Sequence, residues 1–232
     1  MASDSGSGPA AMEGLYPFLY SGTSDLPALL AEVRASTVAK TREIAELRKA
    51  VAARDATRLV NCAEDMAVSF SAGGRLFAFG NGGSATDAQE MATLFLNPGD
   101  GLRPLPAFGL ANDTSVVTAL CNDIGVEVVF ARQLAAFGKR EDIAVGLSTS
   151  GNSENLLRAF AEASHRGMLT VGLAGYEGGR MAEADNIDYL FVAPSSSVHR
   201  IQEAQTTIYH VLWELTLASL DRRARTGRQG AR

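Results

Sequence analysis

Two glycine- and hydroxyl-rich segments of this sequence contain residues suited to binding a phosphate group. They are Gly80-Asn81-Gly82-Gly83-Ser84 and Ser148-Thr149-Ser150-Gly151-Asn152-Ser153. Each follows a short apolar run and precedes a stretch with helical spacing. Glycines let the backbone turn close to a ligand, hydroxyls donate to phosphate oxygens, and a helix N-terminus offers unpaired N–H groups to an anion. The two segments together predict a phosphate pocket.

The bound molecule is expected to be a small phosphorylated compound rather than a nucleotide. No Gly-Lys-Ser/Thr follows the glycines, and the full Gly-x-Gly-x-x-Gly dinucleotide fingerprint is absent from both segments. The alternative interpretation is purely structural. Residues 148–153 would then form a helix-capping turn, and residues 80–84 a tight turn between a strand and a helix.

Composition excludes several classes of protein. The chain has 232 residues, 46% of them hydrophobic, and a formal net charge of −5. An acidic chain is poorly suited to neutralise a nucleic-acid backbone, and no apolar run approaches the ~18 residues that span a membrane. Cys62 and Cys121 lie in helix-like stretches without metal or redox spacing, which favours a reducing compartment. We therefore expect a cytoplasmic protein with neither a nucleic-acid nor a membrane partner.

The pattern from residue 75 onward predicts a parallel β-sheet. Short apolar runs alternate with helical segments, as in βαβ units. The runs are Leu76–Phe79, Pro106–Leu110, Ile143–Leu147, Leu169–Leu173 and Tyr189–Val192. Strands without polar alternation are covered by helices on both faces, and ligands bind at their carboxyl ends, where both candidate segments fall.

The remaining helices frame this sheet. A long amphipathic helix is predicted from a cap at Ser24 or Asp25, and a second helix from a cap at Asp55 to a stop at Gly73-Gly74. The last helix is predicted over about residues 199–220. Three parts follow: an N-terminal extension of residues 1–22, a domain of residues 23–221 that contains both candidate phosphate-binding segments, and a basic, disordered tail of residues 222–232.

The sequence resembles the sugar isomerase (SIS) domain family, specifically its phosphoheptose isomerase branch. The resemblance covers about residues 24–220. It is carried by FAFGNGGSATDAQ (77–89), ANDTSVVTALCND (111–123), STSGNS (148–153), GYEGGRMA (175–182) and HRIQE (199–203). It implies a three-layer α/β, flavodoxin-like fold with five parallel strands, and a homotetramer with active sites between subunits. It also implies aldose–ketose interconversion of a heptose 7-phosphate, such as sedoheptulose 7-phosphate, through an enediol.

The resemblance also implies the site residues. Family members that isomerise carry a His and a Glu on the helix after the first segment, and a Gln and a His on the last helix. Gln202 and His210 match the second pair, whereas the family's His position is Glu90 and its Glu position is Leu94. His210 is then the expected acid/base, Glu90 takes the other proton-transfer role, and Gln202 orients the substrate.

Further site roles follow from the same resemblance. The expected phosphate-binding residues are Asn81, Gly82, Gly83, Ser84, Ser148, Thr149, Ser150, Ser153 and Asp113. Asp113 and Asp123 have the alternative role of helix caps. Glu90, Gln202 and His210 are the candidate ligands of a zinc ion, although no cofactor is required, and the alternative is that Glu90 and His210 hydrogen-bond each other or solvent.

Leu94 motivates a second functional class, because leucine cannot serve as a base. The alternative is a non-catalytic SIS module that binds a sugar phosphate for regulation or scaffolds a protein partner. A third interpretation is a partner-docking role of residues Tyr16–Tyr20, within the aromatic segment Leu15–Tyr20, or of the arginine-rich tail.

Overall fold

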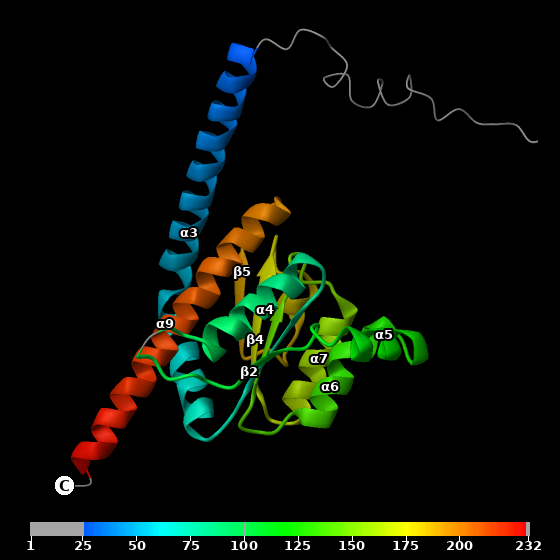
Figure 1. The fold of residues 1–232 in the computed structure, drawn as a ribbon, viewed down its shortest axis with the longest axis vertical. Coiled ribbons are helices and arrows are strands. Elements are labelled where there is room, and N and C mark those ends of the chain that lie inside the picture. Colours follow the sequence, from blue (N-terminus) through cyan, green and yellow to red (C-terminus); the bar gives the residue numbers. More distant parts are fainter. Residues whose placement is uncertain (1–25, 100, 231–232) are drawn as a thin grey trace, which may run out of the picture. The chain divides into compact units, whose positions relative to one another are not determined.

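The computed structural model describes residues 26–99 and 101–230, with side chains described as far as residue 226. Five strands form one fully parallel sheet in the order β2-β1-β3-β4-β5 (Figure 1). They are β1 (Leu76–Gly80), β2 (Ala107–Gly109), β3 (Ile143–Leu147), β4 (Leu169–Gly175) and β5 (Tyr189–Ala193). Each strand lies on one of the five predicted apolar runs, so the parallel sheet is confirmed.

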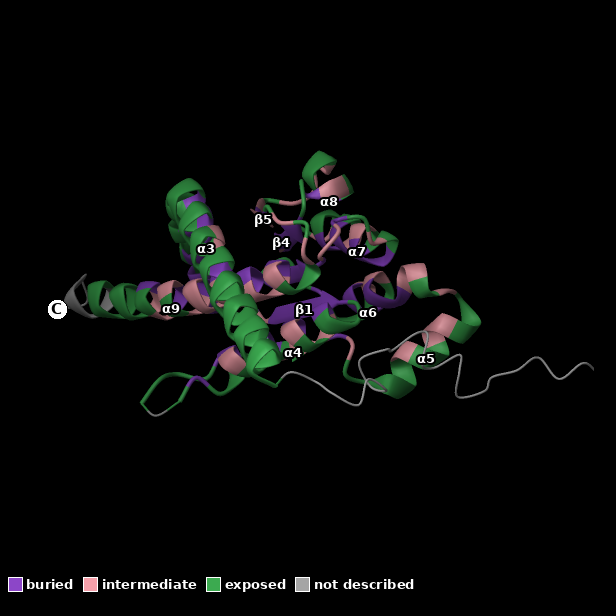
Figure 2. Cartoon of the chain, turned by 90° about the horizontal axis from the view of Figure 1, so that it is seen from above, coloured by how far each residue is buried: buried purple, intermediate pink, exposed green. Residues whose placement is uncertain are grey.

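Helices cover both faces of the sheet, which gives the predicted three layers. They are α3 (Leu26–Ser71), α4 (Gly83–Leu96), α5 (Thr114–Asp123), α6 (Val129–Phe137), α7 (Glu154–His165), α8 (Gly179–Glu183) and α9 (Val198–Gly230), with a short 3-10 helix η1 (Val126–Val128). The residues of strand β1, which is fully buried (Figure 2), point alternately into the apolar cores on the two faces of the sheet. Leu76 and Ala78 join the core under α3, α4 and α9, whereas Phe77 and Phe79 join the core under α6 and α7.

The two helices predicted at the start of the chain are one helix, so the predicted cap at Asp55 is wrong. Asp55 lies inside α3 with only 1% of its surface exposed. Its carboxylate accepts from Arg54 Nε at 3.0 Å and pairs with Arg58 at 3.5 Å. The helix continues because these two arginines, rather than the backbone N–H groups of a new helix, supply the partners of the carboxylate.

The predicted stop of this helix at the glycine pair is confirmed. Gly73 adopts a left-handed conformation with φ of +85°, and the N–H of Gly74 donates to the carbonyl of Ser69 at 2.9 Å. This arrangement satisfies a carbonyl of the last turn. A side chain at residue 74 would collide with the Glu141 carbonyl, because a Cβ there would lie 1.9 Å from its oxygen.

The chain divides into two compact units within α3, one ending at Glu43 and the other comprising Ile44–Arg232. In the first unit, the described residues 26–43 are helical and exposed. The segment Leu15–Tyr20 and the predicted cap at Ser24 or Asp25 lie outside the described residues. Among the described residues, none of the helices combines the length and apolarity of a membrane span.

The end of the chain differs from the sequence prediction. Helix α9 runs to Gly230, so the arginine-rich segment after residue 221 is helical over its described part instead of disordered. The predicted domain boundary between residues 221 and 222 therefore falls inside a helix. Composition missed this because Arg, Ala and Gln are good helix formers and extend a helix that packing has already nucleated.

Candidate functional site

The two candidate segments follow neighbouring strands at the carboxyl edge of the sheet. We call residues 80–84 the glycine loop and residues 148–153 the serine loop. Strands β1 and β3 pair in parallel, with Gly80 opposite Leu147, so both loops leave the sheet next to each other. The chain runs from β1 outward to β2 and returns to β3 on the other side of β1. A reversal of this kind opens the crevice in which parallel α/β sheets bind their ligands.

The glycine loop brings the backbone close to helix α9. Gly82 caps α4 with φ of +55° and makes no side-chain cap hydrogen bond, and Ser84 in the first turn is 5% exposed. A Cβ at residue 83 would lie 2.3 Å from Nε2 of Gln202. Glycine at residue 83 therefore leaves the space that the Gln202 amide fills. In the first turn of α4, the N–H groups of Ser84 and Ala85 donate to the carbonyls of Asn81 and Gly82 at 3.1 and 3.0 Å, so the helix start attracts an anion through its dipole.

Hydroxyl groups shape the serine loop from within. Oγ of Ser148 accepts from the N–H of Gly151 at 3.1 Å, and Oγ of Ser150 accepts from the N–H of Asn152 at 3.2 Å. The Ser148 and Ser153 hydroxyl oxygens are 3.3 Å apart. Ser153 precedes α7 without a side-chain cap hydrogen bond, so the simple capping alternative does not describe this hydroxyl.

Two amide side chains that the sequence analysis missed connect the loops with their surroundings. Asn81 and Asn155 exchange two hydrogen bonds, of 2.9 and 2.8 Å, which join the glycine loop to the first turn of α7. Buried Gln205 donates from Nε2 to the Ser148 carbonyl at 3.1 Å and so attaches the serine loop to α9. No spacing signal distinguished these residues, because each partner lies more than 50 positions away along the chain.

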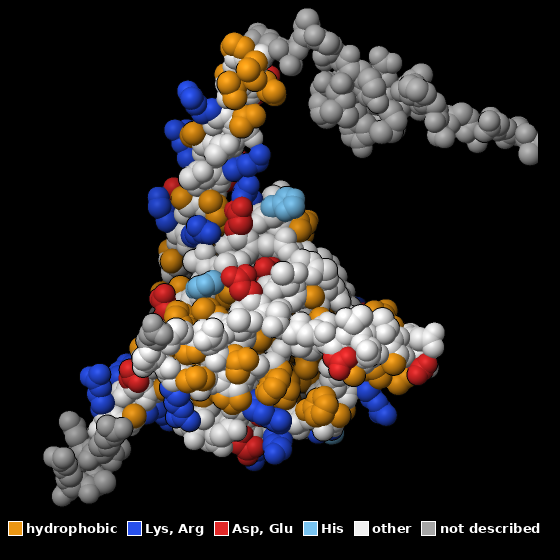
Figure 3. Space-filling view, viewed as in Figure 1, with side chains coloured by type: hydrophobic (Ala, Val, Ile, Leu, Met, Phe, Trp, Pro, Cys, Tyr) orange, Lys and Arg blue, Asp and Glu red, His pale blue; other side chains and the backbone are white. Residues whose placement is uncertain are grey.

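Helices α4 and α9 bring the candidate proton-transfer residues together beside the loops. Glu90 and half-buried Asp87 lie three residues apart on one face of α4. Gln202 of α9 makes a long hydrogen bond, 3.5 Å, to the Asp87 carboxylate. Burial raises the pKa of the Tyr209 hydroxyl, and the nearby charge of Glu90 raises it further. Figure 3 shows acidic side chains and a histidine next to one another on the surface over these helices. Asp87 and Tyr209 are additions to the predicted set.

Burial and charge alter the acidity of Asp87. Burial raises the pKa of this carboxyl group, and the negative charge of Glu90 raises it further, whereas the hydrogen bond from Gln202 lowers it. The carboxylates of α4 therefore repel each other in a partly desolvated place. Such an environment favours keeping a proton near the candidate site.

The imidazole of His210 has a fixed tautomer. Its Nδ1 lies 2.9 Å from the backbone carbonyl oxygen of Thr206, one turn earlier in α9. Since a carbonyl only accepts, Nδ1 carries the hydrogen and Nε2 of the neutral ring has the free lone pair. His210 is half-buried, and its ring stacks on Tyr209 with centroids 5.0 Å apart. The ring can accept a proton at Nε2 and return it.

Leu94, which occupies the family's carboxylate position, packs against the core. Its half-buried side chain contacts the same apolar cluster as Met91, Phe95 and Tyr209. This position therefore contributes apolar packing where a catalytic carboxylate is expected. Glu90, one turn earlier on α4, is the carboxylate that remains beside Tyr209.

The candidate zinc ligands do not fit a zinc site. Structural and catalytic zinc sites use Cys, His, Asp and Glu, usually three or four of them. In the described part of the chain, no group of three or more such residues is placed to hold a metal. Of the candidates, Gln202 is a neutral amide, which is not among the usual ligands of zinc, and its Nε2 donates to Asp87.

Asp113 has the alternative role that the sequence suggested, since its carboxylate accepts from the N–H of Val116 at 3.0 Å and caps α5. Its phosphate role stays a prediction. Asp123 does not cap a following helix, because it is the last residue of α5 and accepts from the Asn122 amide.

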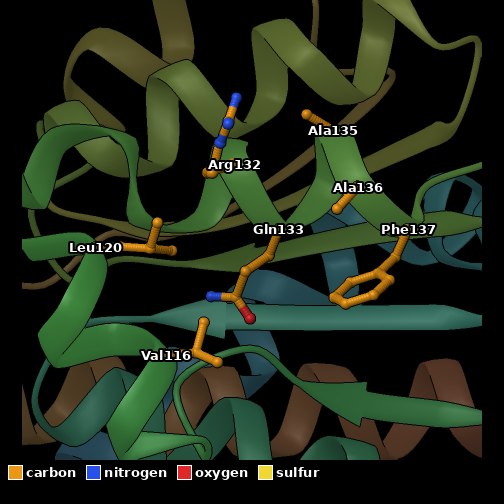
Figure 4. A pocket seen from close by; sticks show the side chains of 7 residues that line it. All are labelled: Val116, Leu120, Arg132, Gln133, Ala135, Ala136 and Phe137. Atoms are coloured by element: carbon orange, nitrogen blue, oxygen red, sulfur yellow. The ribbon is translucent and has the colours of Figure 1, made fainter. Parts of the chain in front are cut away.

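Two cavities lie beyond the loops, on the side of α5 and α6. One, of about 420 Å³, is enclosed by Val116 and Leu120 of α5 and by residues 132–137, with the Gln133 and Phe137 side chains directed toward α5 (Figure 4). The other, of about 300 Å³, is lined by Asp113, Phe77 and Phe108 among others. Their linings are mostly apolar and contain none of the loop hydroxyls, so neither is the predicted phosphate pocket.

Comparison with known proteins gives a consistent result. The SIS domain matches residues 41–175 of this chain. The chain is 42% identical over 175 residues to the phosphoheptose isomerase of Aquifex aeolicus and 44% identical over 179 residues to that of Desulfovibrio desulfuricans. These alignments cover 75% and 77% of this chain, and 91% and 84% of the relatives.

Solved structures extend the likeness to the fold. Phosphoheptose isomerase GmhA from Neisseria gonorrhoeae superposes with a TM-score of 0.73 at 33% identity, covering 79% of this chain and 98% of that one. A phosphoheptose isomerase from Francisella tularensis gives a TM-score of 0.66 at 31% identity, covering 84% and 100%. The chain therefore belongs to the SIS-domain family and, within it, to the phosphoheptose isomerases.

Proposed function

We propose that this protein is an aldose–ketose isomerase that acts on sedoheptulose 7-phosphate or a closely related heptose 7-phosphate. The single observation that carries the proposal is the meeting of the glycine and serine loops at the carboxyl ends of β1 and β3, joined through Asn81 and Asn155. The names of its relatives support the substrate class, because two that share more than 40% of aligned residues are phosphoheptose isomerases.

The serine loop is the proposed phosphate site. Its oxygens accept hydrogen bonds from the loop's own backbone, so the hydroxyl hydrogens of Ser148 and Ser150 stay available for an anion. Thr149, Ser153 and the first turn of α4 with Ser84 complete the set. Neutral donors of this kind bind a phosphate dianion without a paired cation, as helix N-termini do in other proteins.

The proposed chemistry uses the α4–α9 side chains. A base removes the proton from carbon next to the carbonyl, and the same proton returns to the neighbouring carbon, while an acid moves a proton between the two oxygens. His210, with Nε2 as its acceptor, performs one of these transfers, and Glu90 performs the other. Gln202, held over Gly83, orients the sugar.

The direct test is turnover of purified protein with sedoheptulose 7-phosphate, followed as formation of the aldose phosphate. We expect Glu90→Gln and His210→Ala to lower kcat by about a hundredfold, the usual contribution of an acid–base group. Glu214→Gln, an exposed carboxylate on α9, is the matched control and should keep wild-type activity. Wild-type protein without turnover would contradict the proposal.

The same assay tests for a metal. Because the candidate ligand set does not suit zinc, we propose that the reaction proceeds without one, and treatment with EDTA should leave kcat unchanged. Loss of activity in EDTA that returns on adding Zn²⁺ would show that this part of the proposal is wrong.

Leu94 supports a second candidate function, a non-catalytic module that binds a sugar phosphate. Under that alternative, Leu94→Glu would restore the family's carboxylate and create activity where wild type has none. Under the leading proposal, wild type is already active. Phosphosugar-induced thermal stabilisation is expected for both, since any ligand that binds only the folded state raises its apparent stability.

We also propose a cytoplasmic homotetramer. Residues Leu26, Leu29, Leu30 and Val33 recur at helical spacing and are each about half exposed in the single chain, as expected for a helix face that packs against another subunit. Light scattering coupled to size exclusion gives the mass, and a monomer would contradict this assembly.

A further inference from the structure

Gln205 is a buried amide that connects helix α9 with the serine loop. The residue is 0% exposed, and its Nε2 lies 3.1 Å from the backbone carbonyl oxygen of Ser148. Since a carbonyl only accepts, the amide nitrogen is the group that faces it, and Nε2 donates. Gln205 lies on α9 between Gln202 and His210, two residues of the candidate site. This hydrogen bond therefore connects the proposed phosphate loop with the helix that carries those residues.

We propose that Gln205 is a positioning residue of the phosphate site, which holds Ser148 from α9 and so keeps the serine loop in the shape that binds the phosphate group. The inference rests on the proposed function and adds a residue to it. Gln205 has no exposed surface with which to contact the sugar phosphate, so it acts through Ser148. It is absent from the predicted site residues, and the motifs that carry the family resemblance end at residue 203.

Ser148 is held from the sheet, from the serine loop and from α9. Its N–H donates to the carbonyl of Leu173 in β4 at 2.9 Å, and its hydroxyl oxygen accepts from the N–H of Gly151 at 3.1 Å. The hydrogen bond from Gln205 fixes the carbonyl, and with it the peptide plane between Ser148 and Thr149, where the chain leaves β3. The directions of the loop hydroxyls depend on this plane.

Close packing brings α9, the end of β4 and the serine loop into contact. A Cβ at residue 175, the last of β4, would lie 2.4 Å from Cδ1 of Ile201 and 2.5 Å from the Thr149 carbonyl oxygen. Glycine at this position lets α9 and the loop approach each other over the strand. Ile201 lies one turn before Gln205 on the same face of α9, so the amide belongs to a closely packed contact between helix and loop.

The other end of the amide argues against a purely structural role. Oε1 of Gln205 is buried and accepts no hydrogen bond from the described residues. A buried acceptor without a donor destabilises the folded state, which offsets the gain from the Nε2 hydrogen bond. A methionine of similar length would lose the hydrogen bond but would also avoid this cost. We therefore expect Gln205 to matter more for the position of the loop than for the stability of the fold.

The test is Gln205→Met, which keeps the length of the side chain and removes both polar atoms. We expect the Kd for inorganic phosphate, measured by titration calorimetry, to rise about tenfold, while the urea midpoint of unfolding stays near that of wild type. The matched control is Gln133→Met. Gln133 of α6 is also buried, and its Nε2 donates to the carbonyls of Leu110 and Val129 at 2.9 and 3.1 Å. This variant should lower the midpoint and keep the wild-type Kd.

The two glutamines are thus expected to give opposite results in the two measurements. An unchanged Kd in Gln205→Met, or an equal rise of the Kd in Gln133→Met, would overturn the inference. Wild-type protein that binds no phosphate would overturn the proposed phosphate site and the inference together. Because the probe is inorganic phosphate, absence of turnover with a heptose phosphate would contradict the isomerase function alone, and a raised Kd in Gln205→Met would still support the inference.

A second measurement leaves Gln205 in place and so does not depend on folding of its variant. In wild-type protein labelled with ¹⁵N at glutamine, saturation with inorganic phosphate should shift the side-chain amide resonance of Gln205. The reason is that its Nε2 donates to the carbonyl of Ser148, a residue proposed to bind the anion. The resonance of Gln133 should stay in place. An unmoved Gln205 resonance would show that its contact with Ser148 does not respond to phosphate, and would overturn the inference.

Discussion

At the scale of single residues, the serine loop uses each hydroxyl for two purposes. Ser148 and Ser150 accept hydrogen bonds from backbone N–H groups within the loop, which fixes its shape. Because a hydroxyl has one donor and two acceptor sites, the same oxygens remain able to donate to a ligand. Removing Ser148 or Ser150 would therefore disturb the loop as well as the contact. Ser153 is different, because its hydroxyl contacts only that of Ser148 among the hydrogen bonds of the described chain.

Ser153→Ala should consequently weaken phosphate binding without affecting stability. We expect the inhibition constant of inorganic phosphate to rise about tenfold, as for loss of one hydrogen bond to a charged group. The change in melting temperature should be no larger than the change caused by Ser164→Ala, which alters an exposed serine near the end of α7, the helix that Ser153 precedes. Unchanged phosphate inhibition in Ser153→Ala would remove this residue from the site.

Gly83→Ala should separate activity from stability in the glycine loop. The new Cβ would lie 2.3 Å from Nε2 of Gln202, the end of a flexible side chain that can move aside. Alanine also suits the first turn of a helix better than glycine, which offsets the disturbance. We expect a melting temperature close to that of wild type and a drop in kcat/KM of about tenfold, and a fully active variant would contradict the role of Gln202.

At the scale of elements, the strands could be predicted because their signal is local. A run such as Ile143–Leu147, buried at every position, has no polar alternation and therefore indicates a strand between two helix layers. The continuity of α3 could not be predicted in this way. Asp55 has the residue type of a cap, and only its partners Arg54 and Arg58 in the folded helix show that it has a different role.

The same argument applies to the candidate site. The glycine and serine loops could be predicted because the residues that indicate them are adjacent in the sequence. Asn155 and Gln205 acquire their roles only through partners on other elements, at 74 and 57 positions along the chain. A resemblance to a family adds matched positions but does not supply these contacts between elements.

The packing of the serine loop on the β4–α8 turn leads to a further expectation. Gly151 has φ of +67°, and a Cβ there would lie 1.9 Å from the carbonyl oxygen of Gly178. Backbone cannot move aside as a side chain does. Gly151→Ala should therefore destabilise the protein by about 2–3 kcal/mol or more, combining strain with a clash, and should abolish phosphate binding.

Gly73→Ala provides the comparison for this variant. Gly73 has φ of +85° but open space around its Cβ position, so alanine there meets only the conformational strain. We expect a loss of about 1 kcal/mol with normal phosphate binding, measured by urea unfolding and phosphate inhibition. Equal losses of stability in the two variants would show that the contact with Gly178 is unimportant.

At the scale of the whole molecule, burial makes stability depend on alkaline pH. Burial raises the pKa of Cys62, with a further contribution from the charge of Asp65, and burial also raises the pKa of Tyr189, whose hydroxyl donates to Asp65. The unfolded chain titrates these groups at about pH 8.5 and 10. Below those values both states hold the protons, and above them only the folded state does.

The free energy of unfolding should therefore be level from pH 7 to 8 and decline above about pH 8.5, by about 1.4 kcal/mol per pH unit for each proton retained by the folded state. Cys62→Ala removes the first of these groups, so its decline should begin only near pH 10. Cys121→Ala, which also removes one thiol but from a half-buried cysteine of α5, should keep the wild-type dependence of stability on pH. Urea midpoints measured from pH 7 to 10.5 decide the matter, because a decline from pH 8.5 that persists in Cys62→Ala must come from groups other than this thiol.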